Sequence, residues 1–417
     1  MIKLTNHFFI LFAFLLPFHL EAKVIYSWSQ VIPNNMISVR AIVDNRDCPI
    51  ACVDGEEIPM NERVSPVEKK FAEKVCELSL PRETKEIIID DHQIPTLSVQ
   101  IKKIAFIGDT GCRVTNLVEQ ACDSTKEWPL TLILNSISDH NPDLIVHVGD
   151  YHYREKTCKS GQKCNQVYNY GSDAWYSDWF DPARNISELS PFLFLRGNHE
   201  GCSRAYEGWF RYFDPSDFSS AKCSDHIPSW VFDVGPIQLD VFDSSYGKDS
   251  DYTEEQIKTF NEQFDFLLQN NNSKPAWFLT HRPLWSHAKK SAIFYHDGNI
   301  AQVKAFGNRF SANISAIISG HVHIAQIIFM KEKPTQVMVG NGGSLLYSQN
   351  QKPVLYGVDL EGAKAQEIRT LHGFGFAILD LDEHKISFYD ENNNETYFAN
   401  LTEDFCFKIK SRLKKRL

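Results

Sequence analysis

The chain has 417 residues, of which 43% are hydrophobic, and it carries a formal net charge of -10. This length and apolar content allow a sizeable core, in one large domain or in a large and a small one. The negative charge argues against a general binder of nucleic-acid backbones, so we expect no nucleic-acid scaffold as a partner.

Residues 1–22 have the pattern of a secretory signal peptide. Lys3 precedes an apolar block at residues 8–16, Pro17 breaks that block, and Ala22 supplies a small residue before the predicted cleavage point. The block is too short to cross a bilayer, and no other apolar run is long enough. We therefore expect a protein without a membrane span that is secreted or periplasmic after cleavage near Ala22.

Ten cysteines fit an oxidising compartment. Cysteines that are close in sequence are expected to form disulfides that staple loops, namely Cys112/Cys122, Cys158/Cys164 and Cys202/Cys223. Free buried thiols are the alternative. The sequence leaves open the pairing of Cys48, Cys52, Cys76 and Cys406.

Residues 23–98 contain short β-rich pieces, at residues 24–28, 37–43 and 86–89, separated by Pro, Asn and Gly. This pattern predicts a small antiparallel module without a catalytic cluster. From residue 99 to about residue 395, apolar strands alternate with helical segments, which predicts an α/β domain. Residues 396–417 form a basic tail that we expect to be solvated.

Two segments of the α/β region are distinctive. A helix is expected from Thr253, which with Gln256 can form a capping box, and its apolar face includes Phe260 and Phe264. Residues 155–185 form a long insertion rich in Tyr, Trp, Gly and Asp. This insertion either shapes the rim of a site or packs as a surface loop, and the sequence leaves both open.

Polar motifs follow five of the predicted strands. They are Gly108-Asp109-Thr110-Gly111, Gly149-Asp150-Tyr151-His152-Tyr153, Gly197-Asn198-His199-Glu200, Thr280-His281 and Gly320-His321-Val322-His323. Because open α/β sheets place ligands at the carboxyl ends of their strands, we expect these motifs at one rim. Each motif alone has an ordinary explanation as a turn, a cap or a core aromatic, but five in succession favour a metal site.

The potential donors are carboxylate, amide and phenol oxygens together with imidazoles. No cysteine pair has zinc-finger spacing, so a structural tetrathiolate zinc is not expected. Hard oxygen and imidazole donors suit two adjacent divalent or trivalent ions, which can hold a phosphoryl oxygen and a hydroxide.

The order of these motifs resembles the calcineurin-like metallophosphoesterases, over about residues 101–345. Many members have a His two residues after the first Asp, where this chain has Gly111, and Tyr153 supplies a donor instead. That substitution is similar to the purple acid phosphatases. The resemblance implies a four-layer α/β/β/α sandwich, here preceded by the small β-rich N-terminal module.

The resemblance also implies two metal ions that share Asp150. One ion would be held by Asp109, Asp150, Tyr153 and His323, and the other by Asp150, Asn198, His281 and His321. A tyrosinate favours Fe(III) at the first position, whereas the second could be Fe, Zn or Mn.

The implied reaction is attack of a metal-bound hydroxide on phosphorus, with His199 as the acid for the leaving group. His287 and His296 are further candidates for substrate-facing groups and are otherwise loop histidines. Arg113, Arg154, Arg204 and Arg282 are candidate phosphate ligands, and the alternative for each is a counterion to the carboxylate cluster.

We therefore expect an exported phosphatase that hydrolyses phosphomonoesters, acting on a phosphorylated small molecule or a phosphoprotein. A phosphodiesterase or nucleotide hydrolase with the same metal core is the main alternative, and a binding protein with a relic site is a third. The sequence does not indicate the substrate, the identity of the metals or the oligomeric state.

Overall fold

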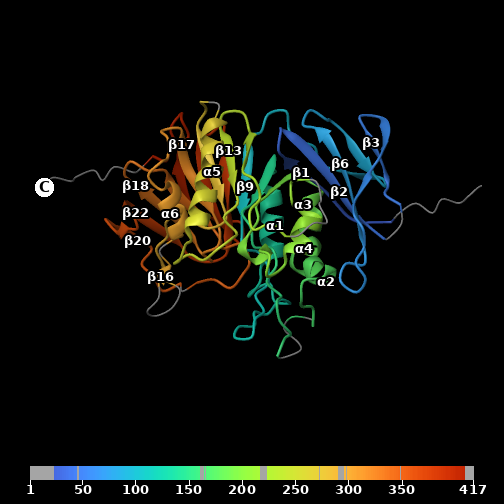
Figure 1. Ribbon diagram of the computed structural model, residues 1–417, viewed down its shortest axis with the longest axis horizontal. Helices are drawn as coiled ribbons and strands as arrows, with labels where there is room; N and C mark the ends of the chain where they lie inside the picture. Colours follow the sequence, from blue (N-terminus) through green and yellow to red (C-terminus); the bar gives the residue numbers. More distant parts are fainter. Residues whose placement is uncertain are drawn as a thin grey trace, which may run out of the picture.

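The computed structural model describes residues 23–44, 47–159, 164, 166–216, 223–271, 273–289, 295–296, 298–347 and 349–408. Two large sheets pack face to face, and helices cover their outer faces (Figure 1). The four-layer α/β/β/α arrangement expected from the resemblance is confirmed. The predicted signal peptide, residues 1–22, lies outside the described residues.

The first sheet contains, in spatial order, β25 (Glu395–Asn400), β24 (Lys385–Asp390), β23 (Gly375–Asp380), β9 (Lys103–Ile107), β10 (Leu144–His147), β11 (Phe192–Phe194), β1 (Val24–Ile32), β2 (Met36–Val43), β6 (Lys74–Pro81) and β5 (Asn61–Val64). The second contains β12 (Trp230–Asp233), β13 (Gln238–Phe242), β14 (Ala276–Thr280), β17 (Ile314–Ser319), β19 (Thr335–Val339), β18 (Ala325–Met330), β22 (Ala363–Leu371) and β20 (Val354–Tyr356), and β21 (Asp359–Leu360) also pairs with β22. A small sheet has the order β4 (Glu56–Pro59), β3 (Ile50–Val53), β7 (Ile87–Ile89) and β8 (His92–Gln93), and β15 (Ala288–Lys289) pairs with β16 (Tyr295–His296).

The helices are α1 (Leu130–Asp139), α2 (Ser172–Trp175), α3 (Asp181–Ser187), α4 (Tyr206–Tyr212), α5 (Glu254–Gln269) and α6 (Ile300–Phe306). A π-helical turn η1 (Tyr176–Phe180) joins α2 to α3, and η2 (Asn198–Glu200) is a short 3-10 turn. Among the described residues, the helices are too short or too polar to traverse a lipid bilayer.

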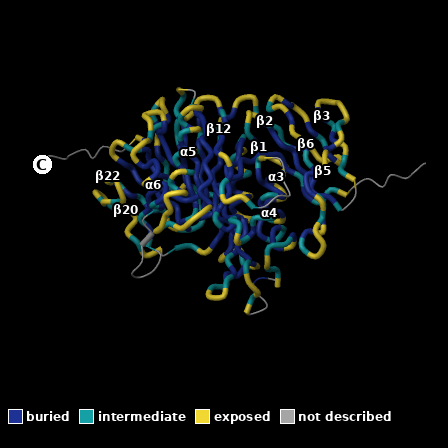
Figure 2. The backbone as a smooth tube through the Cα atoms, viewed as in Figure 1, coloured by how far each residue is buried: buried dark blue, intermediate teal, exposed yellow. Residues whose placement is uncertain are grey.

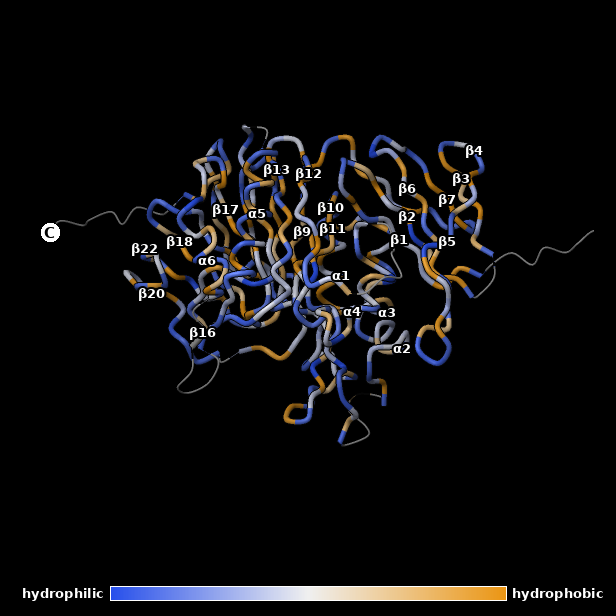
Figure 3. The backbone as a smooth tube through the Cα atoms, in the orientation of Figure 1, coloured by the Kyte–Doolittle hydropathy of each residue, from blue (hydrophilic) through white to orange (hydrophobic). Residues whose placement is uncertain are grey.

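The central strands are apolar on both faces because both faces are covered. On β9, Ile104 and Phe106 pack into the core between the two sheets, whereas Ala105 and Ile107 pack under the outer helices. Successive side chains of a strand point to opposite faces, so a strand buried on both sides has a continuous apolar sequence. The central strands are buried in Figure 2 and largely hydrophobic in Figure 3.

The N-terminal strands extend the main sheet. β1 pairs in parallel with β11, with Gln30 opposite Phe192, and β2, β6 and β5 continue from β1. The β-rich character predicted for residues 23–98 is confirmed. At the other edge, the chain contributes to the sandwich beyond residue 395, because β25 pairs with β24 and Phe405 and Phe407 are buried between the sheets.

The N-terminal cap of α5 differs in one respect from the sequence expectation. Thr253 caps the helix and accepts a hydrogen bond from the Gln256 N–H at 3.1 Å. The reciprocal half of the capping box is absent, because the Gln256 side-chain amide donates instead to the Tyr246 carbonyl at 3.1 Å. Gln256 therefore ties the helix to the preceding loop.

The described part of the aromatic insertion at residues 155–185 has a packed segment at residues 174–180, whereas Lys156, Thr157 and Lys159 are exposed. Trp175, Trp179 and Phe180 are buried against the outer face of the first sheet, in a cluster with Tyr151 and Phe213. The sequence left open whether this insertion shapes the rim of a site or packs on the protein. These three residues pack on the protein.

Four disulfides link eight of the ten cysteines. The three pairs expected from sequence are present, and a fourth joins Cys48 to Cys76. Cys52 and Cys406 are free thiols in the structure. Four disulfides are typical of a protein that folds in an oxidising environment.

Candidate metal centre

The five predicted motifs lie at one rim because their strands run in parallel. Asp109 follows β9, Asp150 follows β10 and Asn198 follows β11 in the first sheet, where these strands pair in parallel. In the second sheet, β14 and β17 are also parallel, and His281 and His321 follow them. The carboxyl ends of strands from both sheets therefore meet around one space.

Three of these residues have an unusual backbone. Asp109, Asp150 and His321 have positive φ angles of 55°, 63° and 68°. A left-handed conformation is costly for a residue with a side chain, and such strain concentrates at functional sites. Hydrogen bonds hold it in place, since Asp109 Oδ2 accepts from the His321 N–H at 2.7 Å and Asp150 Oδ1 from the His199 N–H at 2.8 Å.

The phenol oxygen of Tyr153 lies among three other donor atoms. It is 2.7 Å from Asp150 Oδ2, 3.1 Å from Asp109 Oδ1 and 2.9 Å from His323 Nε2. His323 Nδ1 lies 2.7 Å from the Leu345 carbonyl oxygen, to which it must donate, so a neutral His323 presents a lone pair at Nε2. One phenol proton cannot satisfy three acceptors.

A cation among these atoms resolves that conflict. Burial and the charges of Asp150 and Asp109 raise the pKa of Tyr153, so the phenol ionises here only if a positive charge is supplied. Tyr153 and Asp109 are fully buried, and two carboxylates with an imidazole and a phenol are donors that bind metal ions in proteins. The residues present therefore fit a metal ion.

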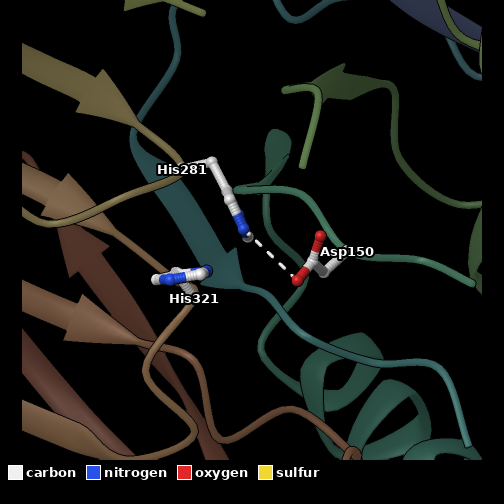
Figure 4. A group of neighbouring side chains, drawn as sticks. All are labelled: Asp150, His281 and His321. Carbon is white, nitrogen blue, oxygen red and sulfur yellow. Dashed lines mark ion pairs between the residues drawn. The ribbon is translucent and has the colours of Figure 1, made fainter. Parts of the chain in front are cut away.

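A second group of donors adjoins the first. Single ligand atoms of Asp150, His281 and His321 lie within 4.8 Å of one another (Figure 4). His281 Nδ1 is 2.8 Å from the Val148 carbonyl, and His281 Nε2 faces Asn198 Oδ1 at 3.0 Å and Asp150 Oδ2 at 3.3 Å. Burial lowers the pKa of His281, but Asp150 outweighs burial and raises it to about 9. Burial lowers the pKa of His321 to about 3, so this imidazole is neutral and can offer a lone pair.

Gly111 makes room for Tyr153. A Cβ atom at Gly111 would lie 2.5 Å from the Tyr151 carbonyl oxygen and 2.8 Å from Tyr153 Cδ2. A side chain at position 111 is thus incompatible with the placement of the residues that bring in the phenol. The absence of a His at position 111 and the presence of Tyr153 are linked by this contact.

Glu200 joins two of the ligand loops. Its carboxylate accepts backbone N–H bonds from Gly197, which caps the η2 turn, and from Asp150, Tyr151 and His152, at 3.0–3.2 Å. Burial and the Asp150 charge raise the pKa of Glu200 to about 8. Glu200 therefore binds together the loops that follow β10 and β11.

His147, which the sequence does not single out, joins the loop after β9 to the loop after β10. Its Nδ1 accepts from the Gly149 N–H at 3.1 Å, so its Nε2 carries the proton and donates to Thr110 Oγ1 at 2.9 Å. The ring is fully buried and stacks on Tyr151 at 3.9 Å.

A cavity of about 160 Å³ opens above these donors. Its lining consists of Arg113, Asp150, Tyr153, Asn198, His199, Arg204, Asp249, His321, His323 and Tyr347. His199 lies in this lining, with its ring 3.9 Å from that of Tyr153 and its Nδ1 3.1 Å from Glu155 Oε1.

Some sequence candidates lie away from the lining. Arg154 is buried, pairs with Asp178 at 2.6 Å and donates to the Cys164 carbonyl, so it braces the aromatic insertion. Arg282 lies 2.5 Å from Asp249 Oδ1 and 3.1 Å from His321 Nε2 and is not part of the cavity lining. Of the two roles considered for it, the structure favours a counterion to a carboxylate. His287 is not one of the described residues that line the cavity. The backbone of His296 pairs with Ala288 in β16, and its side chain lies outside the described part of the chain.

Asp249 and Tyr347 line the cavity but were not predicted. Asp249 Oδ2 is 2.8 Å from His321 Nε2, and the Tyr347 ring lies 5.4 Å from that of His323. Asp249 lies seven residues beyond β13, in an irregular loop, so no strand-end motif identifies it.

The sequence pattern of the calcineurin-like phosphoesterases matches residues 102–325, which is more than half of the chain. The protein belongs to the calcineurin-like phosphoesterase family. It is accordingly a metal-dependent phosphoesterase, and the matched region contains every strand-end motif described above.

Among solved structures, the fold is similar to that of the purple acid phosphatase PPD1 from seeds of yellow lupin (Lupinus luteus). The TM-score is 0.59 at 12% identity, covering 90% of this chain and 74% of the lupin chain. The phosphoesterase YfkN of Bacillus subtilis matches with a TM-score of 0.31 at 12% identity, covering 75% of this chain and 89% of the other. Vps29 of Chaetomium thermophilum gives 0.28 at 10% identity, covering 72% and 95%. No curated protein sequence matches the chain.

Proposed function

We propose that this phosphoesterase is an exported phosphatase that hydrolyses phosphomonoesters with two metal ions, in the manner of a purple acid phosphatase. The observation that carries the proposal is the convergence of Asp109, Asp150 and His323 on the Tyr153 phenol, beside the Asp150, His281 and His321 group. Four disulfides support the oxidising compartment that export would provide.

Asp150 would be shared between the two ions. Asp109, Tyr153 and His323 would complete the first set of ligands, with iron(III) favoured by the phenol, and Fe, Zn or Mn would occupy the second. Asn198, His281 and His321 would complete that second set. When bound, such ions supply hydroxide at mildly acid pH and neutralise charge on phosphoryl oxygens.

The remaining groups would position the substrate and handle the proton. His199 reaches the cavity and would protonate the leaving alkoxide. Glu155 Oε1 lies 3.1 Å from His199 Nδ1, so its negative charge would favour the protonated imidazole, which would deliver its proton from Nε2. Glu200 and His147 would keep the ligand loops at fixed separation through their backbone hydrogen bonds.

The proposal is tested by comparing the metal-loaded protein on nitrophenyl phosphate and on bis(nitrophenyl) phosphate. We expect kcat/KM for the monoester to exceed that for the diester by at least about tenfold. A preference for the diester would replace the proposal with a phosphodiesterase. Hydrolysis of neither ester, in protein that retains its metals, would indicate a binding protein with a relic site.

A further inference from the structure

Two arginines line the cavity and come from different loops. Arg113 belongs to the loop after β9, and Arg204 to the turn that precedes α4. Both are half-buried, so each can meet a ligand in the cavity while remaining shielded from bulk solvent. The two arginines differ in one respect: only one of them has a carboxylate close enough to neutralise its charge.

Arg204 has an acidic partner. Its Nε lies 3.5 Å from Glu155 Oε1, the same oxygen that lies 3.1 Å from His199 Nδ1. The positive charge of Arg204 is therefore largely offset before any substrate binds.

Arg113 lies over the face of Tyr153, with its guanidinium carbon 5.7 Å from the ring centroid. Within the described part of the chain, no carboxylate lies within ion-pair distance of its guanidinium. Stacking on an aromatic ring leaves the edge of the guanidinium available for hydrogen bonds. Arg113 thus supplies positive charge to the cavity that the protein itself does not neutralise.

The backbone of Arg113 is held firmly. Its N–H donates to Gln120 Oε1 at 2.8 Å, its carbonyl accepts from the Gln120 N–H at 2.9 Å, and the preceding residue forms the Cys112–Cys122 disulfide. Gln120 is itself anchored, because its side-chain amide donates to the Gly343 carbonyl at 2.8 Å. A fixed backbone reduces the entropy lost when a side chain binds a ligand.

We infer that Arg113 binds the phosphate group of the substrate and selects dianionic phosphomonoesters over monoanionic diesters. A guanidinium binds phosphate oxygens through two parallel, charge-assisted hydrogen bonds. A monoester has a second negative charge and a third terminal oxygen, whereas a diester has neither the charge nor the oxygen. The inference rests on the proposed phosphatase function and names the residue that sets its substrate class.

The test is Arg113→Gln in the full-length, metal-loaded protein. We expect the Kd for inorganic phosphate, measured by calorimetry, to rise about 10- to 100-fold. KM for nitrophenyl phosphate should rise by a similar factor with kcat changed less than about threefold, and kcat/KM for the diester should fall less than about threefold. Arg113→Lys, which keeps the charge but loses the bidentate geometry, should restore part of the phosphate affinity.

Arg184→Gln is the matched control. Arg184 also lies over a tyrosine ring, that of Tyr26, at 4.3 Å, but it is on α3, outside the cavity lining. The Arg184→Gln substitution removes the same charge and the same type of stacking as Arg113→Gln. We expect the Arg184→Gln variant to bind inorganic phosphate with wild-type affinity.

Three results would overturn the inference: unchanged phosphate affinity in Arg113→Gln, equal losses for monoester and diester, or a loss that follows a fall in metal content. If the wild type hydrolyses no phosphoester, the proposed function fails, and phosphate calorimetry still decides whether Arg113 binds the anion. If the wild type is active and Arg113→Gln binds phosphate normally, only the role of Arg113 fails.

Discussion

At the scale of single residues, Tyr153 is the side chain on which the account of the metal centre depends most. Iron-loaded protein should show a tyrosinate-to-iron charge-transfer band, and Tyr153→Phe should lose it because the phenolate is removed. Visible absorption spectroscopy measures this directly. Tyr151→Phe is the control, since Tyr151 is equally buried but donates its hydroxyl to the Leu195 carbonyl at 2.9 Å. A band that survives in Tyr153→Phe would refute the ligand role.

His199 makes a separate prediction about proton transfer. His199→Ala should retain both metal ions but lower kcat about 10²- to 10⁴-fold for substrates with poor leaving groups, because the alkoxide then leaves without a proton. Steady-state kinetics with alkyl and nitrophenyl phosphates measure the effect, which should be smaller for the nitrophenyl ester. His140→Ala, remote from the site at the end of α1, serves as the control. Equal losses on both esters would remove the acid role.

Residues in motifs were more predictable than residues that support them. The seven proposed ligands follow from short motifs at strand ends, and the structure brings them together. Asp249 and Tyr347 come from irregular loops, where no periodic pattern relates sequence to position. The role of Arg282 was also unresolved from sequence, because an arginine beside a carboxylate cluster can face either the substrate or the carboxylates.

At the scale of elements, an ion cluster fixes the N-terminal strands to the main body. Glu77 on β6 pairs with Arg40 on β2 at 2.8 Å and with Arg63 on β5 at 2.6 Å. Arg40 also donates to the Tyr212 carbonyl at the end of α4. Burial alone would raise the pKa of Glu77, but the two arginines outweigh it and lower the pKa to about 2.

This shift predicts loss of stability in acid. The folded-state pKa lies below the ordinary value of 4.5, so the contribution is fully present above about pH 5 and disappears as the pH falls toward 2. The shift corresponds to about 3 kcal/mol. Urea unfolding should show Glu77→Gln destabilised at pH 7, with the gap to wild type closing near pH 2. Glu68→Gln, at a highly exposed carboxylate, is the control. A gap that does not depend on pH would contradict the assignment.

Strands were easier to predict than their order in the sheets. The central strands are covered on both faces, so nearly every residue in them is apolar. Such continuous apolar runs are visible in the sequence. The pairing of β1 with β11 joins segments about 160 residues apart, and no local pattern indicates it. The half-formed capping box at Thr253 shows a similar limit, because the Gln256 side chain bonds to a loop whose path depends on the whole fold.

At the scale of the whole molecule, the metal centre joins the two sheets of the sandwich. Asp109 and Asp150 come from the first sheet and His281 and His321 from the second, so metal binding should stabilise the packing between them. A ligand that binds only the folded state stabilises it by mass action. We expect chelation to lower the midpoint of thermal unfolding by roughly 5 °C, measured by calorimetry and reversed by re-addition of metal. An unchanged midpoint would show that no ion bridges the sheets.

The number of metal ions bound per chain distinguishes a dinuclear centre from a mononuclear or empty site. Elemental analysis of metal-loaded, full-length protein after gel filtration should give two ions per chain, at least one of them iron when iron is supplied. Asp150→Ala should retain neither ion at stoichiometric occupancy, because Asp150 contacts both groups of donors. A wild type that holds one ion or none, or an Asp150 variant that still holds two, would contradict the account.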